Sequence, residues 1–264
     1  LTAAKTAWLA ARVPYQQTEA YRFGNAVVDD WEGRVNAWPL DEAYIDYVDG
    51  ARESGISNNV ADYPEITREL IVSLNETGAE ENISAGYHAI EFLLWGQDFF
   101  VDSAGQRSYT DYGVDAAVPN AERRGQYLLL VTEQLVENLA QMVNAWAPGV
   151  ADNYRVEFLA LAPDDAMQKM LTGLGVLSKS ELAGERMFTA LDNRDQEDEH
   201  SCFSDNTHRD IITNNMGIVN VYTGHYTRLD GSVVSGPSIA NVVEAVDPEL
   251  NGQMLALLER SMAL

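Results

Sequence analysis

The feature that most constrains the fold is a long run of apolar residues at helical spacing between residues 121 and 147. They recur at intervals of three and four: Leu128, Val131, Leu135, Leu139, Met142 and Trp146. This spacing places them on one face of a helix, which is typical of a helix that packs in a bundle. Strictly alternating apolar and polar residues between turn signals are hard to find in the chain. The sequence therefore predicts an all-α protein.

Similar patterns predict further helices at 2–23, 64–77, 82–98, 163–192, 206–223, 238–246 and 248–262. Gly78 and Gly96 are expected to end two of them. Residues 99–119 carry scattered Gly, Asp and Ser and end in Pro119, which indicates a boundary. We therefore expect two helical-bundle domains, each like a four-helix bundle, packed together: residues 1–118, with the HxxE motif described below, and residues 119–264.

Composition and charge exclude several classes of protein. The 264 residues are 46% hydrophobic, which is enough to bury a core. The chain holds 17 Lys and Arg against 41 Asp and Glu, a net charge of −24, so it repels nucleic acid and anionic membranes and attracts cations. A single cysteine, Cys202, excludes an intramolecular disulfide and paired-cysteine zinc or redox motifs. No run of about 18 apolar residues occurs, so we expect no transmembrane segment.

His88 and Glu91 are the first candidates for chemistry. They stand three residues apart in the segment GYHAIEFLLWGQD at 86–98, so their side chains are neighbours on one helix face. Apolar residues cover most of the rest of this helix, which predicts that the pair is buried. A buried ionisable pair is costly unless other groups satisfy it. Two interpretations stay open: two ligands of a metal site, or a structural hydrogen-bonded pair, which a bare HxxE match by itself favours.

Three glutamates occupy positions that helical spacing assigns to the inward face of their helices. Glu19 lies on the inward face of the first predicted helix, and Glu181 and Glu185 lie on that of the helix at 163–192. Carboxylates that face a His/Glu helix across a core resemble the metal sites of four-helix bundles. In the alternative, Glu19 pairs with Arg22 and Glu185 pairs with Arg186 at the surface.

The segment QEDEHSCFSDNTHRD at 196–210 combines acidic residues with two histidines: Glu197, Asp198, Glu199, His200, Asp205, His208 and Asp210. Oxygen donors with imidazoles suit a divalent or ferric cation, although a solvated acidic turn is an equal alternative. Cys202 and Phe203 in its middle indicate that part of the segment turns inward. The chain has no phosphate-binding glycine loop, no GxSxG and no HExxH.

The segment at 86–98 is similar to the GxHxxE signature of imelysin-like proteins. Segments at 14–23, 38–48, 181–187 and 196–208 look like the iron-regulated protein A branch of that family, so the resemblance covers nearly the whole chain. It implies a fold related to a pair of four-helix bundles, a bacterial periplasmic or outer-envelope location and a part in iron uptake beside other envelope proteins. Position 1 is Leu, and we expect any leader to lie outside this chain.

From these residues we expect a site at the interface of the two domains that binds iron, another divalent metal or an iron-containing ligand. The expected metal ligands are His88, Glu91 and Glu19, and the expected ligand-binding residues are Gly86, Glu181, Glu185, Arg22, Glu197 and His200. Founding members of the family were described as peptidases, so a metal-dependent peptidase is the alternative. A zinc peptidase needs two histidines four apart, a third ligand and a glutamate base. Phe92 stands where an inverted motif needs histidine, so we favour a binding protein without catalytic residues.

Overall fold

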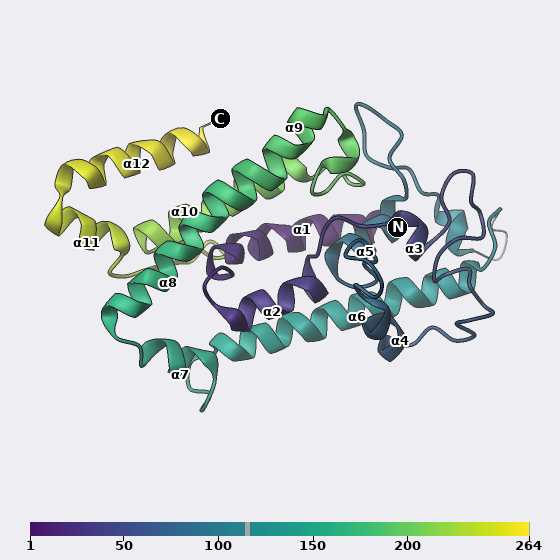
Figure 1. Cartoon of the computed structure of the whole chain (residues 1–264), viewed down its shortest axis with the longest axis horizontal. Coiled ribbons are helices and arrows are strands. Elements are labelled where there is room, and N and C mark those ends of the chain that lie inside the picture. The colour runs from purple at the N-terminus through teal and green to yellow at the C-terminus, as the bar shows by residue number, and fades with distance from the viewer. Residues whose placement is uncertain (114–116, 264) are drawn as a thin grey trace. The chain divides into compact units, whose positions relative to one another are not determined.

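The computed structural model describes residues 1–113 and 117–263, and helices make up most of it (Figure 1). The helices are α1 (Thr2–Thr18), α2 (Ala26–Val35), α3 (Glu42–Ile45), α4 (Arg68–Leu74), α5 (Gly86–Trp95), α6 (Ala121–Trp146), α7 (Tyr154–Leu159), α8 (Pro163–Val176), α9 (Thr189–Asn193), α10 (Thr207–Thr223), α11 (Ile239–Val246) and α12 (Pro248–Met262). The all-α prediction is confirmed. Within the described ranges, no helix combines the length and the apolar composition that crossing a membrane requires.

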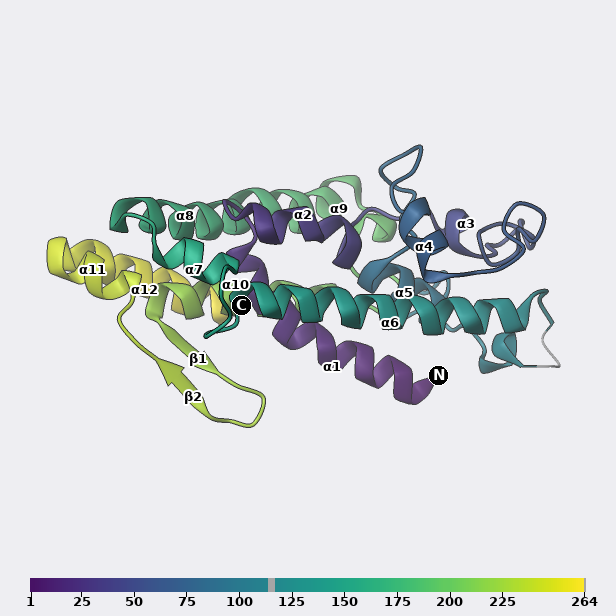
Figure 2. The same ribbon diagram turned by 90° about the horizontal axis from the view of Figure 1, so that it is seen from below.

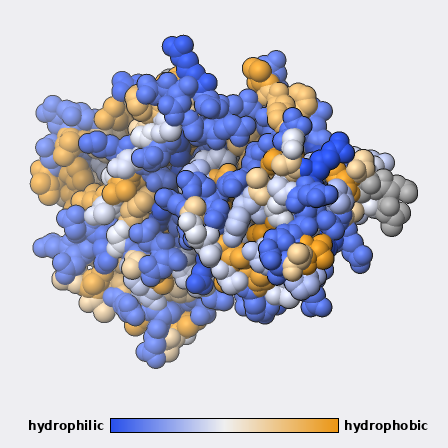
Figure 3. Space-filling view, turned by 45° about the vertical axis from the view of Figure 1, so that its right-hand side comes forward, coloured by the Kyte–Doolittle hydropathy of each residue, from blue (hydrophilic) through white to orange (hydrophobic). Residues whose placement is uncertain are grey.

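A short antiparallel hairpin is a departure from the helical pattern. Strands β1 (His225–Thr227) and β2 (Val233–Ser235) lie side by side in Figure 2. They pair with Tyr226 opposite Val234. Three-residue strands are too short to give an alternating pattern in the sequence. On the face drawn in Figure 3, hydrophilic residues cover much of the surface and separate apolar patches lie between them.

The chain divides into two compact units, and each is made of separate stretches of chain. The first contains Leu1–Leu9, Asp30–Leu159 and Gln196–Thr207, and the second contains Ala10–Asp29, Ala160–Asp195 and His208–Leu264. The sequence predicted two continuous domains with a boundary between residues 118 and 119, which differs from this division. Helix α6 lies in the first unit, where Tyr127 donates a hydrogen bond to the carbonyl oxygen of Ser84 (2.8 Å). Residues 114–116, beside the predicted boundary, and residue 264, at the predicted end, lie outside the described residues.

Helix α5 is the most deeply buried helix segment of the first unit. Every residue from Gly86 to Trp95 is buried, as the apolar pattern predicts. The helix ends at Gly96, whose φ of 70° lies in the left-handed region that favours glycine. On α6, Val131 and Leu135 of the predicted face are buried. The helical periodicity therefore identified the main core-forming faces of this unit.

Several buried charges in the first unit are paired. Asp46 is completely buried and accepts hydrogen bonds from two arginines: Arg107 Nη1 at 2.7 Å and Arg124 Nη2 at 2.9 Å. Both guanidinium groups lie over the ring of Tyr47, at 4.9 and 5.1 Å from its centre. This network ties the loop after α3 to the start of α6.

The second unit contains an apolar cluster whose buried members are Ala20, Leu174, Leu177, Leu182, Ile218, Tyr222 and Ile239. The helix predicted over 163–192 is present as α8, a π-helical segment at Leu177–Phe188 and α9, which form one continuous run in Figure 1. Hydrogen bonds in a π-helix join residues five apart rather than four, so the inward face advances along the sequence.

This π-helical segment changes which side chains face inward. After Leu177 the buried positions are Leu182 and Arg186. Glu181 is half-buried, and Glu185 is exposed. The prediction that Glu185 faces the core is therefore wrong, because it assumed regular α-helical spacing.

Other helix ends differ because polar side chains cap them. Thr67 accepts a hydrogen bond from the Leu70 amide and begins α4, so the helix starts later than predicted. Asn75 follows its last residue, and its Oδ1 accepts from the amide of Ser84 (3.0 Å). Helix α4 therefore ends at Leu74, before the predicted end at Gly78. The first helix likewise ends at Thr18, where a 3-10 turn follows.

Gly86 allows α5 to pack closely against the end of α2. Its φ is 85°, and a Cβ atom at this position would lie 2.7 Å from the carbonyl oxygen of Val35. Real Cβ atoms do not approach backbone oxygens this closely, and other residues rarely adopt this φ. Gly86, which the sequence analysis placed among the ligand-binding residues, therefore has a packing role in the structure.

We predict that Gly86→Ala lowers the free energy of unfolding by about 2–4 kcal/mol, from backbone strain and a steric clash. The matched control is Gly125→Ala on α6, where the nearest atom to an added Cβ is a Tyr112 ring carbon at 3.8 Å. This control is expected to be neutral or to stabilise by about 0.5–1 kcal/mol. Urea unfolding followed by circular dichroism measures both, and a Gly86→Ala variant as stable as the control would contradict the packing role.

Candidate functional site

Helix α5 holds His88 and Glu91 together inside the first unit. The Nδ1 atom of His88 lies 2.8 Å from Oε2 of Glu91, and both side chains have no exposed surface. The burial predicted from the apolar sequence around them is confirmed. Because a carboxylate only accepts, the hydrogen bond places a proton on Nδ1 of His88. In the neutral imidazole, Nε2 then carries the lone pair.

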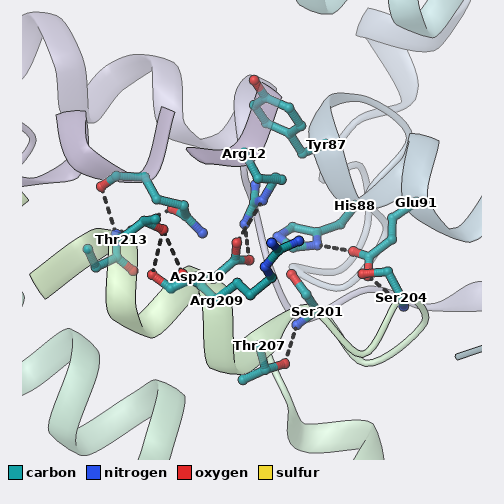
Figure 4. Close-up of polar contacts among 12 residues, drawn as sticks. Arg12, Tyr87, His88, Glu91, Ser201, Ser204, Thr207, Arg209, Asp210 and Thr213 are labelled. Carbon is teal, nitrogen blue, oxygen red and sulfur yellow. Dashed lines mark hydrogen bonds and ion pairs between the residues drawn. The ribbon is translucent and has the colours of Figure 1, made fainter. Parts of the chain in front are cut away.

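The second oxygen of Glu91 is held by the segment that follows residue 196. Ser204 donates to Oε1 of Glu91 from both its backbone amide (3.0 Å) and its hydroxyl (2.6 Å). Figure 4 shows His88, Glu91 and Ser204 joined by these contacts. Ser204 was not among the predicted site residues, because no local pattern distinguishes it from the other polar residues of this segment. Both carboxylate oxygens of Glu91 thus accept hydrogen bonds from the protein.

Two aromatic rings pack against His88. The ring of His200 lies 4.7 Å from it between centres, and the ring of Trp38 lies 5.0 Å from it, both edge to face. Phe203 packs against Trp38 at 5.8 Å. His200, Cys202 and Phe203 are buried, so the prediction that part of the acidic segment turns inward is confirmed. Trp38 was not among the predicted site residues, because its place beside His88 depends on the tertiary fold.

The remaining acidic segment does not gather into one cluster. Glu197 and His208 are exposed, and Asp198, Glu199 and Asp205 are half-buried. Within residues 1–113 and 117–263, no group of three or more His, Cys, Asp and Glu side chains is arranged to hold a metal ion. The donor set among these residues therefore does not fit a bare ion held by protein side chains alone.

In the second unit, Glu19 belongs to a buried ion-pair network. Its Oε2 lies 2.6 Å from Nη1 of Arg186, and Asn214 donates to the same oxygen at 3.2 Å. Arg186 also binds Glu181 at 2.7 Å, and Arg22 lies 3.7 Å from Glu181. Burial alone would lower the pKa of Arg186, but the charges of Glu19 and Glu181 outweigh it and raise this pKa. The guanidinium group thus balances the carboxylate that sequence spacing offered as a metal ligand.

Asp210 has a similar partner in the second unit. Its Oδ2 accepts a hydrogen bond from Nη2 of Arg12 at 2.7 Å, and both side chains are 1% exposed. Figure 4 shows this pair. A buried carboxylate that binds a guanidinium group is stabilised without a metal. The acidic segment at 196–210 therefore includes residues with different local roles.

Glu42 is a titratable residue that was not among the predicted site residues. Burial, followed by the charge of Glu197, raises its pKa to about 7. Gln97 donates a hydrogen bond to Glu42. Burial, with the charges of Glu91 and Glu197, also raises the pKa of the Cys202 thiol well above its ordinary value. Cys202 is therefore protonated at neutral pH, which is the opposite of what a nucleophilic cysteine requires.

Residues 1–263 match the family model described as Imelysin, Peptidase M75. The chain belongs to the imelysin family. The family resemblance drawn from the GYHAIEFLLWGQD segment is therefore confirmed.

A sequence relative and a solved structure that are similar to this chain are both named iron-regulated protein A. Iron-regulated protein A of Synechococcus elongatus is 26% identical over 262 residues, which cover 96% of this chain and 60% of that protein. The chain thus spans about 60% of the length of this relative. A crystal structure described as an iron-regulated protein A precursor from Parabacteroides distasonis superposes with a TM-score of 0.68. The two sequences are 20% identical, and the superposition covers 98% of this chain and 71% of the other. At this level of identity the comparison shows a similar fold.

We predict that Glu42→Gln increases stability more at pH 8 than at pH 4. The carboxyl group of Glu42 ionises near pH 4.5 when unfolded and at about pH 7 when folded. Its contribution to stability is therefore full below pH 4.5 and is lost as the pH rises to about 7. Urea unfolding at several pH values measures the difference between variant and wild type. Exposed Glu185→Gln is the control, and an equal effect of Glu42→Gln at all pH values would contradict the raised pKa.

Proposed function

We propose that this imelysin-family protein binds an iron-containing ligand in the bacterial cell envelope and takes part in iron uptake. The observation that carries the proposal is the buried His88 imidazole, oriented by Glu91 and in edge-to-face contact with the rings of Trp38 and His200. The names of the two relatives support the connection with iron. The net charge of −24 is consistent with a cationic or metal-bearing partner.

A carboxylate that holds the Nδ1–H of an imidazole is a common support for a metal-binding histidine. It fixes the tautomer and makes Nε2 a better electron-pair donor. In this arrangement Glu91 has the supporting role: its Oε2 holds His88, and its Oε1 accepts from Ser204. Glu19 is similarly engaged by Arg186.

The nature of the donors favours a chelated iron over a bare ion. Within the described residues, no set of three or more acidic, cysteine or histidine side chains could hold an ion alone. A ligand that already supplies most of the coordination sphere needs one imidazole from the protein. His88, with His200 beside it, suits that need, and the iron is then cargo.

We predict that His88→Ala weakens iron binding at least about tenfold, and that Glu91→Gln weakens it by about tenfold as a supporting residue. The probes are ferric citrate and anaerobic ferrous iron, added to protein purified without chelators or nickel resin. Isothermal titration calorimetry measures affinity, and elemental analysis measures bound iron.

The matched control for this experiment is His225→Ala, because His225 is exposed on β1. It is expected to bind iron like wild type, and circular dichroism checks that each variant is folded. Unchanged affinity in His88→Ala would place the site elsewhere, with Glu197 and the rest of the segment at 196–210 as the next candidate. A wild-type protein that binds neither probe would overturn the proposal.

The alternative function is a metal-dependent peptidase. Hydrolytic zinc sites use three protein ligands and a carboxylate base next to the metal-bound water. Glu91 is the carboxylate of the motif, and its oxygens are directed at His88 and Ser204 instead. This arrangement favours binding over hydrolysis.

We predict that the purified protein does not cleave unfolded protein substrates in the presence of added zinc, iron or manganese. The physical reason is the engagement of Glu91 as a hydrogen-bond acceptor within the protein. Gel electrophoresis and mass spectrometry detect cleavage products. Cleavage that is present in wild type and in His225→Ala but lost in His88→Ala would support the peptidase and contradict the binding protein.

A further inference from the structure

A cavity in the first unit shares none of its described lining residues with the candidate iron site. Its volume is about 580 Å³. Its walls come from α3, from the loop at residues 53–63 and from the residues directly before α6. The volume lies within the range of about 300–1,000 Å³ that small-molecule sites occupy, so the cavity has room for a ligand of one or two rings.

The loop at residues 53–63 is fixed to the rest of the unit by backbone hydrogen bonds. The amide of Ile56 donates to the carbonyl oxygen of Tyr44 at 2.9 Å, which joins the loop to α3. Arg123 of α6 donates to the carbonyl oxygen of Tyr63 at 2.7 Å. The loop is therefore held on two sides by the protein itself, and the cavity is formed before a ligand binds.

Two tyrosines supply aromatic surface to the cavity. Tyr44 and Tyr63 both line it, and each is half-buried. Burial, followed by the neighbouring Tyr63, raises the pKa of Tyr44, so this phenol is uncharged at neutral pH. A tyrosine ring offers a flat apolar face beside a polar hydroxyl group, which suits a ligand that is itself flat on one face and polar at its edge.

The polar groups at the cavity are mainly hydrogen-bond acceptors. Glu53 lines the cavity and is exposed, and a carboxylate only accepts. Asn120 uses its amide nitrogen to donate to Oδ1 of Asn58 at 3.0 Å, so its own Oδ1 is the end that is left to accept. The hydroxyl of Tyr63 can donate or accept. A ligand rich in hydroxyl groups supplies the donors that these acceptors need.

The charges around the cavity favour a neutral ligand. Among the described lining residues Glu53 is the one acidic residue, and none is Lys or Arg. Opposite to this negative charge, the N-terminus of α6 carries a partial positive charge and begins directly after Asn120. Arg123, in the first turn of the same helix, adds a positive charge near the wall. Charges of both signs thus offset each other, so neither an anion nor a cation gains much here.

We propose that this cavity binds a neutral carbohydrate of one or two rings. The C–H face of a sugar ring packs against Tyr44 and Tyr63, and its hydroxyl groups donate to Glu53 and Asn120. The aromatic surface selects for a ring, and the carboxylate and amide oxygens select for hydroxyl groups on it. The site is independent of iron binding at His88.

The test uses the full chain with glucose and cellobiose, whose rings have flat C–H faces. The matched probes are sorbitol, which has the hydroxyl groups without the ring, the cation glucosamine and the anion glucuronate. Ligand-observed NMR and isothermal titration calorimetry measure binding. We expect saturable binding of glucose and cellobiose, about tenfold weaker binding of sorbitol, and no gain in affinity for either charged sugar. Equal affinity for sorbitol, or a tenfold gain for a charged sugar, would overturn the proposal.

Variants locate the binding in this cavity. Tyr63→Ala and Glu53→Ala are each expected to weaken cellobiose binding by about tenfold. The matched controls are Tyr109→Ala and Glu80→Ala, which are exposed and are not among the described lining residues. Their affinities are expected to equal that of wild type, and circular dichroism checks that each variant is folded. Absence of saturable binding of both glucose and cellobiose in wild type, or unchanged affinity in folded Glu53→Ala, would overturn the proposal.

Discussion

The need to satisfy the buried carboxylate of Glu91 constrains the first unit. This group has no exposed surface, so each of its oxygens requires a donor from within the protein. His88 supplies one from the same helix, and Ser204 supplies two from a segment far along the chain. These contacts place the segment after residue 196 against α5. His200 comes beside His88 as a consequence, and so the candidate site depends on this one carboxylate.

Other buried carboxylates also need partners within the protein, and arginine side chains provide them. Asp46 binds Arg124 in the first unit, while Glu19 binds Arg186 in the second. The chain has few basic residues for its 41 acidic ones, yet several of them are used inside. An inward-facing carboxylate is therefore weak evidence for a metal ligand, because a guanidinium group balances its charge equally well. From the sequence, Glu19 could be interpreted as a metal ligand or as half of an ion pair. In the structure it forms an ion pair with Arg186.

Local pattern predicted much of the helical structure. The helices at 206–223, 238–246 and 248–262 agree closely with α10, α11 and α12, because each has a long enough apolar stripe. The deep burial of α5 followed from apolar residues on all its faces. The π-helical segment did not follow, since its register depends on packing beyond the local sequence. Because of this shift of register, Arg186 is buried where Glu185 was expected. The buried side chain is therefore a cation and not a possible metal-binding carboxylate.

The sequence by itself determined the all-α class, the burial of His88 and Glu91 and the family. These depend on composition, on short-range spacing and on a motif, all of which are local properties of the chain. Only the tertiary structure decided the partners: Ser204 for Glu91, Arg186 for Glu19 and Glu197 for the raised pKa of Glu42. Each of these contacts joins residues that are distant in the chain. Helical periodicity specifies which face of an element is buried, but it carries no information about which side chain from elsewhere meets that face.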